Sequence, residues 1–285
     1  MAAGAVIGAI QRQGGELLTG RQGCWRNGRG NWMIWDLLPL LPLGILAGLL
    51  SGLLGIGGGL IFSPLLLALG LTPHQALATS TLAILPTTLA GSWTHLRSGL
   101  VPTQAVLSIA AGAITGSLVF SNAGNAMQGW HLLALQAAMY GVLAGVISPR
   151  RKDQEEGGAP PLPLFSLSGV GLVAGWSSGL LGVGGGLVMV PLMVQVLGIR
   201  VYQAIRLSTI AVCASAAAAS FTFWSDGRGH LGMGLLLGAT AAVAAQWSAS
   251  RLQSVSESRL VWLLRLLCGV LALDAARRAL QLALS

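Results

Sequence analysis

The chain has 285 residues, of which 54% are hydrophobic and 8% are charged, and its mean hydropathy is +0.74. Soluble domains carry about 25% charged residues, so this composition excludes a soluble globular protein and predicts a polytopic membrane protein. The net charge of +8 does not indicate a nucleic-acid partner, because the basic residues lie mostly in short loops and tails, a pattern that fits an anionic membrane leaflet.

The start of the chain differs from the rest. Residues 1–10 are apolar but lack a basic beginning, so they do not predict a cleaved signal peptide, and a polar stretch rich in Gly and Arg follows them. We expect residues 1–35 to be a disordered tail, and we interpret Met33 as an alternative translation start. The three cysteines are far apart and form no CxxC motif, so no disulfide, metal site or cofactor is predicted.

Apolar runs separated by polar or turn-rich breaks predict ten segments. The first half contains segments at 36–55, 58–70, 74–97, 103–121 and 128–147. The second half contains segments at 164–181, 185–198, 202–225, 231–250 and 259–281. The charged, proline-rich stretch between them predicts a polar linker at 149–163. The expected organisation is therefore a first transmembrane repeat over 36–148 and a second over 164–285.

The two halves resemble each other in sequence. Aligning Gly48 with Gly175 pairs SGLLGIGGGLIFSPL with SGLLGVGGGLVMVPL, and one extra residue before Gly198 then pairs ALATSTLA with AIRLSTIA. Further along, SWTHLRSG at 92–99 meets SFTFWSDG at 220–227. A repeat of roughly 127 residues is too long for a solenoid, and a duplicated bundle of spans is the usual plan of a secondary transporter.

The second segment of each half is too short to cross a bilayer, since 13 or 14 residues at 1.5 Å per residue fall short of a ~30 Å hydrocarbon core. We therefore expect an all-α polytopic fold of about eight transmembrane helices, with broken helices and half-helices at the glycine-rich motifs. Two topologies remain open. If each broken pair is one crossing, both termini and the linker share one side; if it is two, the repeats are inverted.

The doubled glycine motif predicts two non-helical breaks inside the membrane. Such backbone is tolerated only where it is buried in protein or lines a wet cavity. Glycine allows positive φ and close approach, and the start of the next half-helix presents free N–H groups and a positive dipole end, which favour an anion. The predicted binding residues are Gly57, Gly58, Gly59, Gly184, Gly185 and Gly186. The alternative is helix packing through small-residue seams at Gly52/Gly55/Gly59 and Gly179/Gly182/Gly186.

Polar side chains follow each motif. Thr79, Ser80 and Ser208 are candidate hydroxyl donors to an anion, although such hydroxyls often bond their own helix. Arg206 has no basic counterpart, because Ala78 aligns with it. A charge inside the membrane is costly, and a guanidinium binds an oxyanion through two parallel donors, so Arg206 is a further candidate. The alternative for Arg206 is snorkelling to the membrane surface.

These motifs resemble the TauE/SafE family of membrane transporters, often called sulfite exporters. The resemblance rests on the doubled G-x-G-G-G-x-x-x-x-P with a following A-T-S and extends from about residue 37 to 281. It implies transport of sulfite, thiosulfate, sulfoacetate, related organosulfonates or carboxylates across the bacterial inner membrane without ATP hydrolysis. It also implies that the motif glycines, Thr79, Ser80 and Ser208 lie at the substrate region. Arg206 and Leu207 stand where the first copy has Ala78 and Thr79, so the hydroxyl pattern is asymmetric.

We therefore predict a multi-pass transporter of the bacterial inner membrane that moves a small anion by alternating access, with a proton or sodium ion as coupling ion. Its expected partners are the lipid bilayer and the anionic substrate. An enzyme is not expected, because the sequence supplies no intramembrane catalytic pair or HExxH motif. The alternative is a non-transporting accessory or assembly protein, which would tolerate loss of the glycines as long as packing survived.

Overall fold

The computed structural model describes residues 40–97, 99, 101–124, 127–147, 164–227 and 229–284. The predicted tail at 1–35 and the predicted linker at 149–163 lie outside these residues. The chain forms two units, Met1–Leu40 and Leu41–Ser285, and the contacts that build the fold lie within the second. In this described part every regular element is a helix, which confirms the predicted all-helical class.

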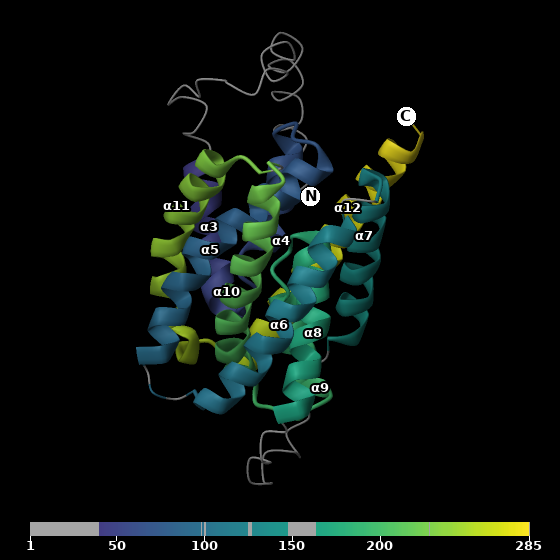
Figure 1. Ribbon diagram of the computed structural model, residues 1–285. Coiled ribbons are helices and arrows are strands. Elements are labelled where there is room, and N and C mark those ends of the chain that lie inside the picture. Colours follow the sequence, from purple (N-terminus) through teal and green to yellow (C-terminus); the bar gives the residue numbers. More distant parts are fainter. Residues whose placement is uncertain are drawn as a thin grey trace. The chain divides into compact units, whose positions relative to one another are not determined.

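The helices follow the predicted segments closely (Figure 1). The first half contains α3 (Leu40–Leu54), α4 (Gly59–Ala68), α5 (Pro73–Arg97), α6 (Thr103–Ala123) and α7 (Gly129–Val146). The second half contains α8 (Leu164–Leu181), α9 (Gly186–Gln195), α10 (Val201–Ser225), α11 (Leu231–Ser250), the short 3-10 helix η3 (Leu252–Ser254) and α12 (Glu257–Leu284).

Helix length separates full spans from half-helices. Five described helices are long and apolar enough to cross a membrane, namely α6, α7, α8, α10 and α11. The 25 residues of α5 and the 28 of α12 also exceed the ~20 residues that a span needs, but these helices carry more polar and charged residues. The 10 residues of α4 and of α9 reach only ~15 Å. The count of eight transmembrane helices stays a prediction.

Glycine rows let pairs of helices approach closely. In the contact of α6 with α8, a Cβ at Gly175 would lie 2.7 Å from the Ser117 nitrogen. Gly179 packs on α6 in the same way. Along α3, a Cβ at Gly52 would lie 2.9 Å from the Ala249 nitrogen near the end of α11. Lipid tails are as apolar as the side chains, so such backbone contact supplies packing that hydrophobicity alone does not. The packing alternative therefore applies to Gly52 and Gly179.

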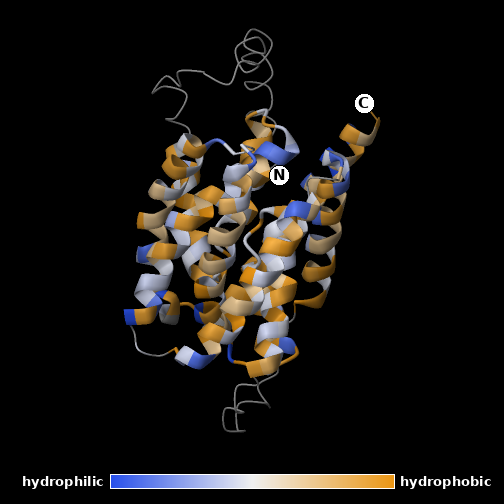
Figure 2. Ribbon diagram, in the orientation of Figure 1, coloured by the Kyte–Doolittle hydropathy of each residue, from blue (hydrophilic) through white to orange (hydrophobic). Residues whose placement is uncertain are grey.

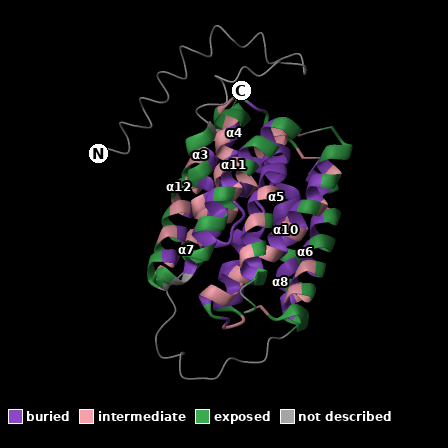
Figure 3. Ribbon diagram, turned by 90° about the vertical axis from the view of Figure 1, so that its left-hand side faces the viewer, coloured by how far each residue is buried: buried purple, intermediate pink, exposed green. Residues whose placement is uncertain are grey.

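Helices α5 and α10 form the buried centre of the bundle. Of the most apolar window of α10, 67% is buried, against 28% for α7. Figure 3 shows the same contrast, with buried residues concentrated on α5 and α10 and exposed ones on α6, α7 and α12. Hydrophilic residues gather toward the helix ends, while the hydrophobic ones run along the helices (Figure 2). The outer helices therefore offer their apolar faces to lipid.

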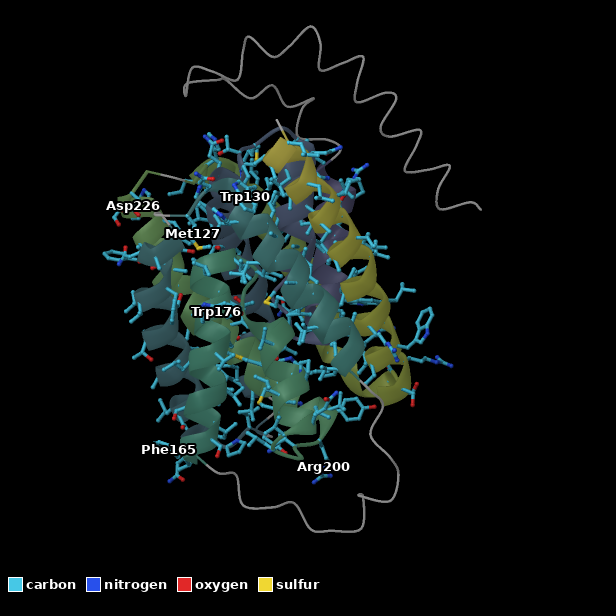
Figure 4. All side chains as sticks on the ribbon, turned by 90° about the vertical axis from the view of Figure 1, so that its right-hand side faces the viewer. Met127, Trp130, Phe165, Trp176, Arg200 and Asp226 are labelled. Carbon is cyan, nitrogen blue, oxygen red and sulfur yellow. The ribbon has the colours of Figure 1, made fainter. Side chains whose placement is uncertain are left out.

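The chain reverses direction at the second glycine motif. In Figure 4, Phe165 at the start of α8 and Arg200 before α10 lie at one end, Trp176 lies at mid-height, and Asp226 after α10 lies at the opposite end. The Gln195 side chain at the end of α9 also donates to the Val146 carbonyl at the end of α7, at 2.6 Å. The pair α8–α9 thus enters and leaves at the same end, which corresponds to counting the broken pair as an entry and a return.

Candidate functional site

Both glycine motifs interrupt their helices, as predicted. The backbone turns through positive φ at three glycines of each break: 68°, 78° and 79° at Gly55, Gly57 and Gly58, and 60°, 90° and 65° at Gly182, Gly184 and Gly185. Among the described residues only glycines adopt positive φ, since a side chain there costs ~1–2 kcal/mol. The breaks therefore depend on glycine, and α4 and α9 begin directly after them.

The two breaks pack directly against each other. A Cβ at Gly59 would overlap the carbonyl of Val183, and a Cβ at Gly186 would overlap the carbonyl of Gly55. A Cβ at Gly184 would lie 3.2 Å from the Ile56 carbonyl oxygen. Gly59 and Gly186, the first residues of the half-helices, are thus needed for a different reason, because the opposing backbone occupies the space of a side chain.

Two serines fasten the breaks, each from the opposite half of the chain. The Ser80 hydroxyl on α5 lies 2.9 Å from the Gly182 carbonyl oxygen, and the Ser208 hydroxyl on α10 lies 3.0 Å from the Gly55 carbonyl oxygen. Each hydroxyl also contacts a carbonyl one turn earlier on its own helix. In this conformation the single hydrogen of each serine is therefore directed to carbonyl oxygens, and the serines stabilise the breaks.

Apolar side chains close the contact between the breaks. Ile84 on α5 and Val212 on α10 occupy aligned positions of the two halves, and both are fully buried. A Cβ at Gly57 would meet Val212 at 2.7 Å and Ile84 at 3.0 Å, and a Cβ at Gly184 would meet the same two side chains. Ile56 and Val183, inside the breaks, are also fully buried. The breaks are thus shut off from solvent in this conformation.

The beginnings of two half-helices meet at this contact. Gly59 and Gly186 are the first residues of α4 and α9, and each lies against the opposing break. The first N–H groups of a helix have no acceptor within it, and the helix dipole adds a partial positive charge there. In this conformation each such end lies against a carbonyl of the opposing break, Val183 for Gly59 and Gly55 for Gly186, and an anion would take the place of that carbonyl. This arrangement is suited to binding negative charge once the breaks separate.

Thr79 and Arg206 lie outside this cluster. The Thr79 hydroxyl oxygen is buried and accepts a hydrogen bond of 3.0 Å from the backbone N–H of His230, just before α11. Arg206 is half-buried on α10, two residues before Ser208. The structure thus gathers the six motif glycines with Ser80 and Ser208, and it places Thr79 and Arg206 beside them on other helix faces.

Comparison with known proteins gives the family. The model of the family described as sulfite exporter TauE/SafE matches residues 40–275. The chain belongs to the TauE/SafE family. A TauE/SafE protein is a membrane transporter, and the five apolar spans agree with a multi-pass arrangement. Within the described residues no three His, Cys, Asp or Glu side chains gather in a way that could hold a metal ion.

Relatives carry names that agree with the TauE/SafE assignment. The chain is 30% identical to a "probable membrane transporter protein" of Xylella fastidiosa over 187 residues, which is 63% of this chain and 70% of that protein. It is 28% identical to the "probable membrane transporter protein YunE" of Bacillus subtilis, over 54% of this chain and 66% of that protein. It is also 41% identical to the Arabidopsis thaliana "sulfite exporter TauE/SafE family protein 3" over 24% of this chain and 15% of that protein. No solved structure matches the chain.

Sequence reasoning about this TauE/SafE protein missed the apolar plug of Ile84 and Val212. Both look like ordinary apolar residues of a membrane span. The one signal that could have identified them is their position, since each lies one turn after the serine that fastens a break, at equivalent places of the aligned halves.

Proposed function

We propose that this chain is a secondary transporter that exports a small anion, namely sulfite, an organosulfonate, or another sulfur-containing or carboxylate anion. The observation that carries the proposal is the meeting of two glycine breaks, each followed by the N-terminus of a half-helix, at the buried centre of the bundle. Two positive helix ends in one place favour a negative ligand. The motif glycines with Ser80, Ser208, Thr79 and Arg206 are its proposed binding residues.

Reciprocal contacts support alternating access between two inverted repeats. Ser80 of the first half holds the break of the second, and Ser208 of the second half holds the break of the first. Antiparallel α5 and α10 exchange these contacts, as a twofold axis in the membrane plane requires. In our proposal this conformation is the occluded one, and separation of the breaks on one side or the other exposes the anion site.

The membrane potential is a sufficient driving force for export. A negative interior favours outward movement of an anion by ~2.3 kcal/mol per charge per 100 mV. We place the protein in the bacterial inner membrane, where this potential exists, and we keep a proton or sodium ion as the proposed coupling ion for uphill transport.

Flux in proteoliposomes tests the proposal. The purified protein is reconstituted into vesicles loaded with sulfite, thiosulfate, sulfoacetate or acetate, and efflux is measured with the potential set by potassium and valinomycin. We expect saturable efflux of at least one anion. This efflux should be absent from anion-loaded vesicles that lack the protein, and it should be faster when the vesicle interior is negative. If the folded protein gives no more efflux of any of the four anions than protein-free vesicles do, the accessory-protein alternative is favoured instead.

A further inference from the structure

Helices α5 and α10 run antiparallel, and their contacts fix their register. Near the middle of both helices, a Cβ at Gly57 would meet Thr88 of α5 at 3.1 Å and Val212 of α10 at 2.7 Å. One turn further along α5 and one turn back along α10, the Ser92 hydroxyl donates to the Thr209 carbonyl oxygen at 3.3 Å. A Cβ at the neighbouring Gly91 would lie 3.1 Å from the Thr209 methyl carbon. These contacts define the α5–α10 seam. Because the helices are antiparallel, each turn toward the C-terminus of α5 pairs with a turn toward the N-terminus of α10.

The same register brings a basic pair together. One more turn leads from Ser92 to His95 on α5 and from Thr209 to Arg206 on α10, and residues three apart lie on the same helix face. The register set by Ser92 and Thr209 therefore places His95 and Arg206 at the same level of the seam. His95 is buried, with 3% of its surface exposed, while Arg206 is half-buried. This end of the seam therefore carries one partly accessible positive charge, on Arg206, beside a buried imidazole.

The opposite end of the seam is apolar. There Ala78 on α5 lies in a buried cluster with Phe223 and Ala219 on α10. In the alignment of the two halves, Ala78 is the counterpart of Arg206, and Phe223 is the counterpart of His95. Equivalent places of the two halves thus hold opposite chemistry, one end sealed by apolar side chains and the other end basic.

The basic end of the seam lies beside the first glycine break. The two helices that form this end contribute no acidic side chain. Neither α5 nor α10 contains Asp or Glu. Arg206 directly follows Ile205, and a Cβ at Gly55 would lie 2.8 Å from the Ile205 carbonyl oxygen. The nearby Arg97 is directed elsewhere, since it stacks over the Trp93 ring at 5.6 Å. Arg206 therefore stands one residue along α10 from a backbone contact with the break.

We propose that His95 and Arg206 form a docking site for a small oxyanion at one end of the α5–α10 seam, from which the anion passes to the adjacent break. The inference rests on the proposed function and adds the route by which the substrate arrives. The guanidinium supplies two parallel N–H donors to a sulfite, sulfonate or carboxylate group, and the imidazole supplies a third. The end sealed by Ala78 and Phe223 supplies none, so anions dock from one side of the membrane only.

Equilibrium binding of sulfite to the purified full-length protein, measured by calorimetry, tests the docking site separately from transport. The test variants are Arg206→Gln and His95→Phe, the second of which introduces the residue found at the equivalent place of the other half. Arg200→Gln is the matched control, because it removes a neighbouring positive charge just before α10. We expect Kd to rise about tenfold or more in both test variants, because each loses a hydrogen bond to the charged anion. In the control we expect Kd to change less than twofold. Arg206→Lys should recover part of the affinity.

The outcomes separate the docking site from the proposed function. Native affinity in Arg206→Gln and His95→Phe, while the native protein transports sulfite, would overturn the docking site and leave the transport function standing. Weakened binding in both variants of a protein that transports no tested anion would support the docking site and contradict the proposed function. Absence of sulfite, sulfate and acetate binding to the native protein would overturn the docking site. Thermal unfolding of each variant confirms that folded protein is compared.

Discussion

Single hydroxyls hold the two breaks in place. Ser80 and Ser208 each donate to a carbonyl of the opposite half, and both side chains are fully buried. The sequence alignment could place these serines near the breaks, because they occupy equivalent positions. It could not identify their acceptors, which lie 102 and 153 residues away along the chain, and a helical hydroxyl bonds its own backbone just as readily.

Replacing these serines tests that role. Ser80→Ala and Ser208→Ala each remove the hydroxyl that donates to a buried carbonyl of the opposing break. Each substitution should therefore lower the free energy of unfolding by ~1–3 kcal/mol. Ser225→Ala is the control, since the Ser225 hydroxyl is exposed and donates to the Thr222 carbonyl of its own helix. Thermal unfolding in detergent measures the effect. Equal stability of all three variants would show that the serines do not fasten the breaks.

Glycine serves two purposes that look alike in a helical sequence. In α8, Gly171, Gly175 and Gly179 recur every four residues and pack on α6, whereas Gly182, Gly184 and Gly185 end the helix with positive φ. Apolar periodicity predicted the segments and their bounds well, because span length and break chemistry are local properties. It could not separate the packing glycines from the break glycines, because that difference depends on which helix lies opposite.

The packing role predicts a selective loss of stability in one helix. Gly175→Val should destabilise the protein by ~1–3 kcal/mol, because its side chain would meet the α6 backbone at Ser117. Gly169→Val in the same helix has open space around its Cβ and serves as the control. Unfolding midpoints in detergent compare the two. A control as unstable as Gly175→Val would mean that helix propensity, and not the seam, sets the cost.

At the scale of the whole molecule, the path of the chain favours one of the two topologies that sequence left open. Positive charges could not choose between the two topologies, because the answer depends on whether a broken pair returns to its own side. In the structure, Phe165 and Arg200 lie at one end and Asp226 at the other (Figure 4). The α8–α9 pair therefore returns, and our proposal of inverted repeats follows from that path.

Labelling with a membrane-impermeant maleimide tests this topology. Single cysteines replace Phe165, Arg200 or Asp226 in a background where the three native cysteines are alanine. We expect Phe165→Cys and Arg200→Cys to react from the same side of the membrane and Asp226→Cys to react from the opposite side. Reaction of positions 165 and 200 from different sides would mean that α8 and α9 together form a single crossing.

The central claim is that the two glycine breaks together form the path of the transported anion. Its most direct test is sulfite efflux from proteoliposomes that contain equal amounts of folded native protein, Gly58→Ala, Gly185→Ala or the control Gly141→Ala. Gly58 and Gly185 have positive φ and crowded surroundings, whereas a Cβ at Gly141 meets nothing within 4 Å. The account predicts native efflux in the control and a loss of about tenfold or more in each break variant, in line with the ~1–2 kcal/mol strain of a left-handed residue together with its steric clash. Native efflux in both break variants would contradict it.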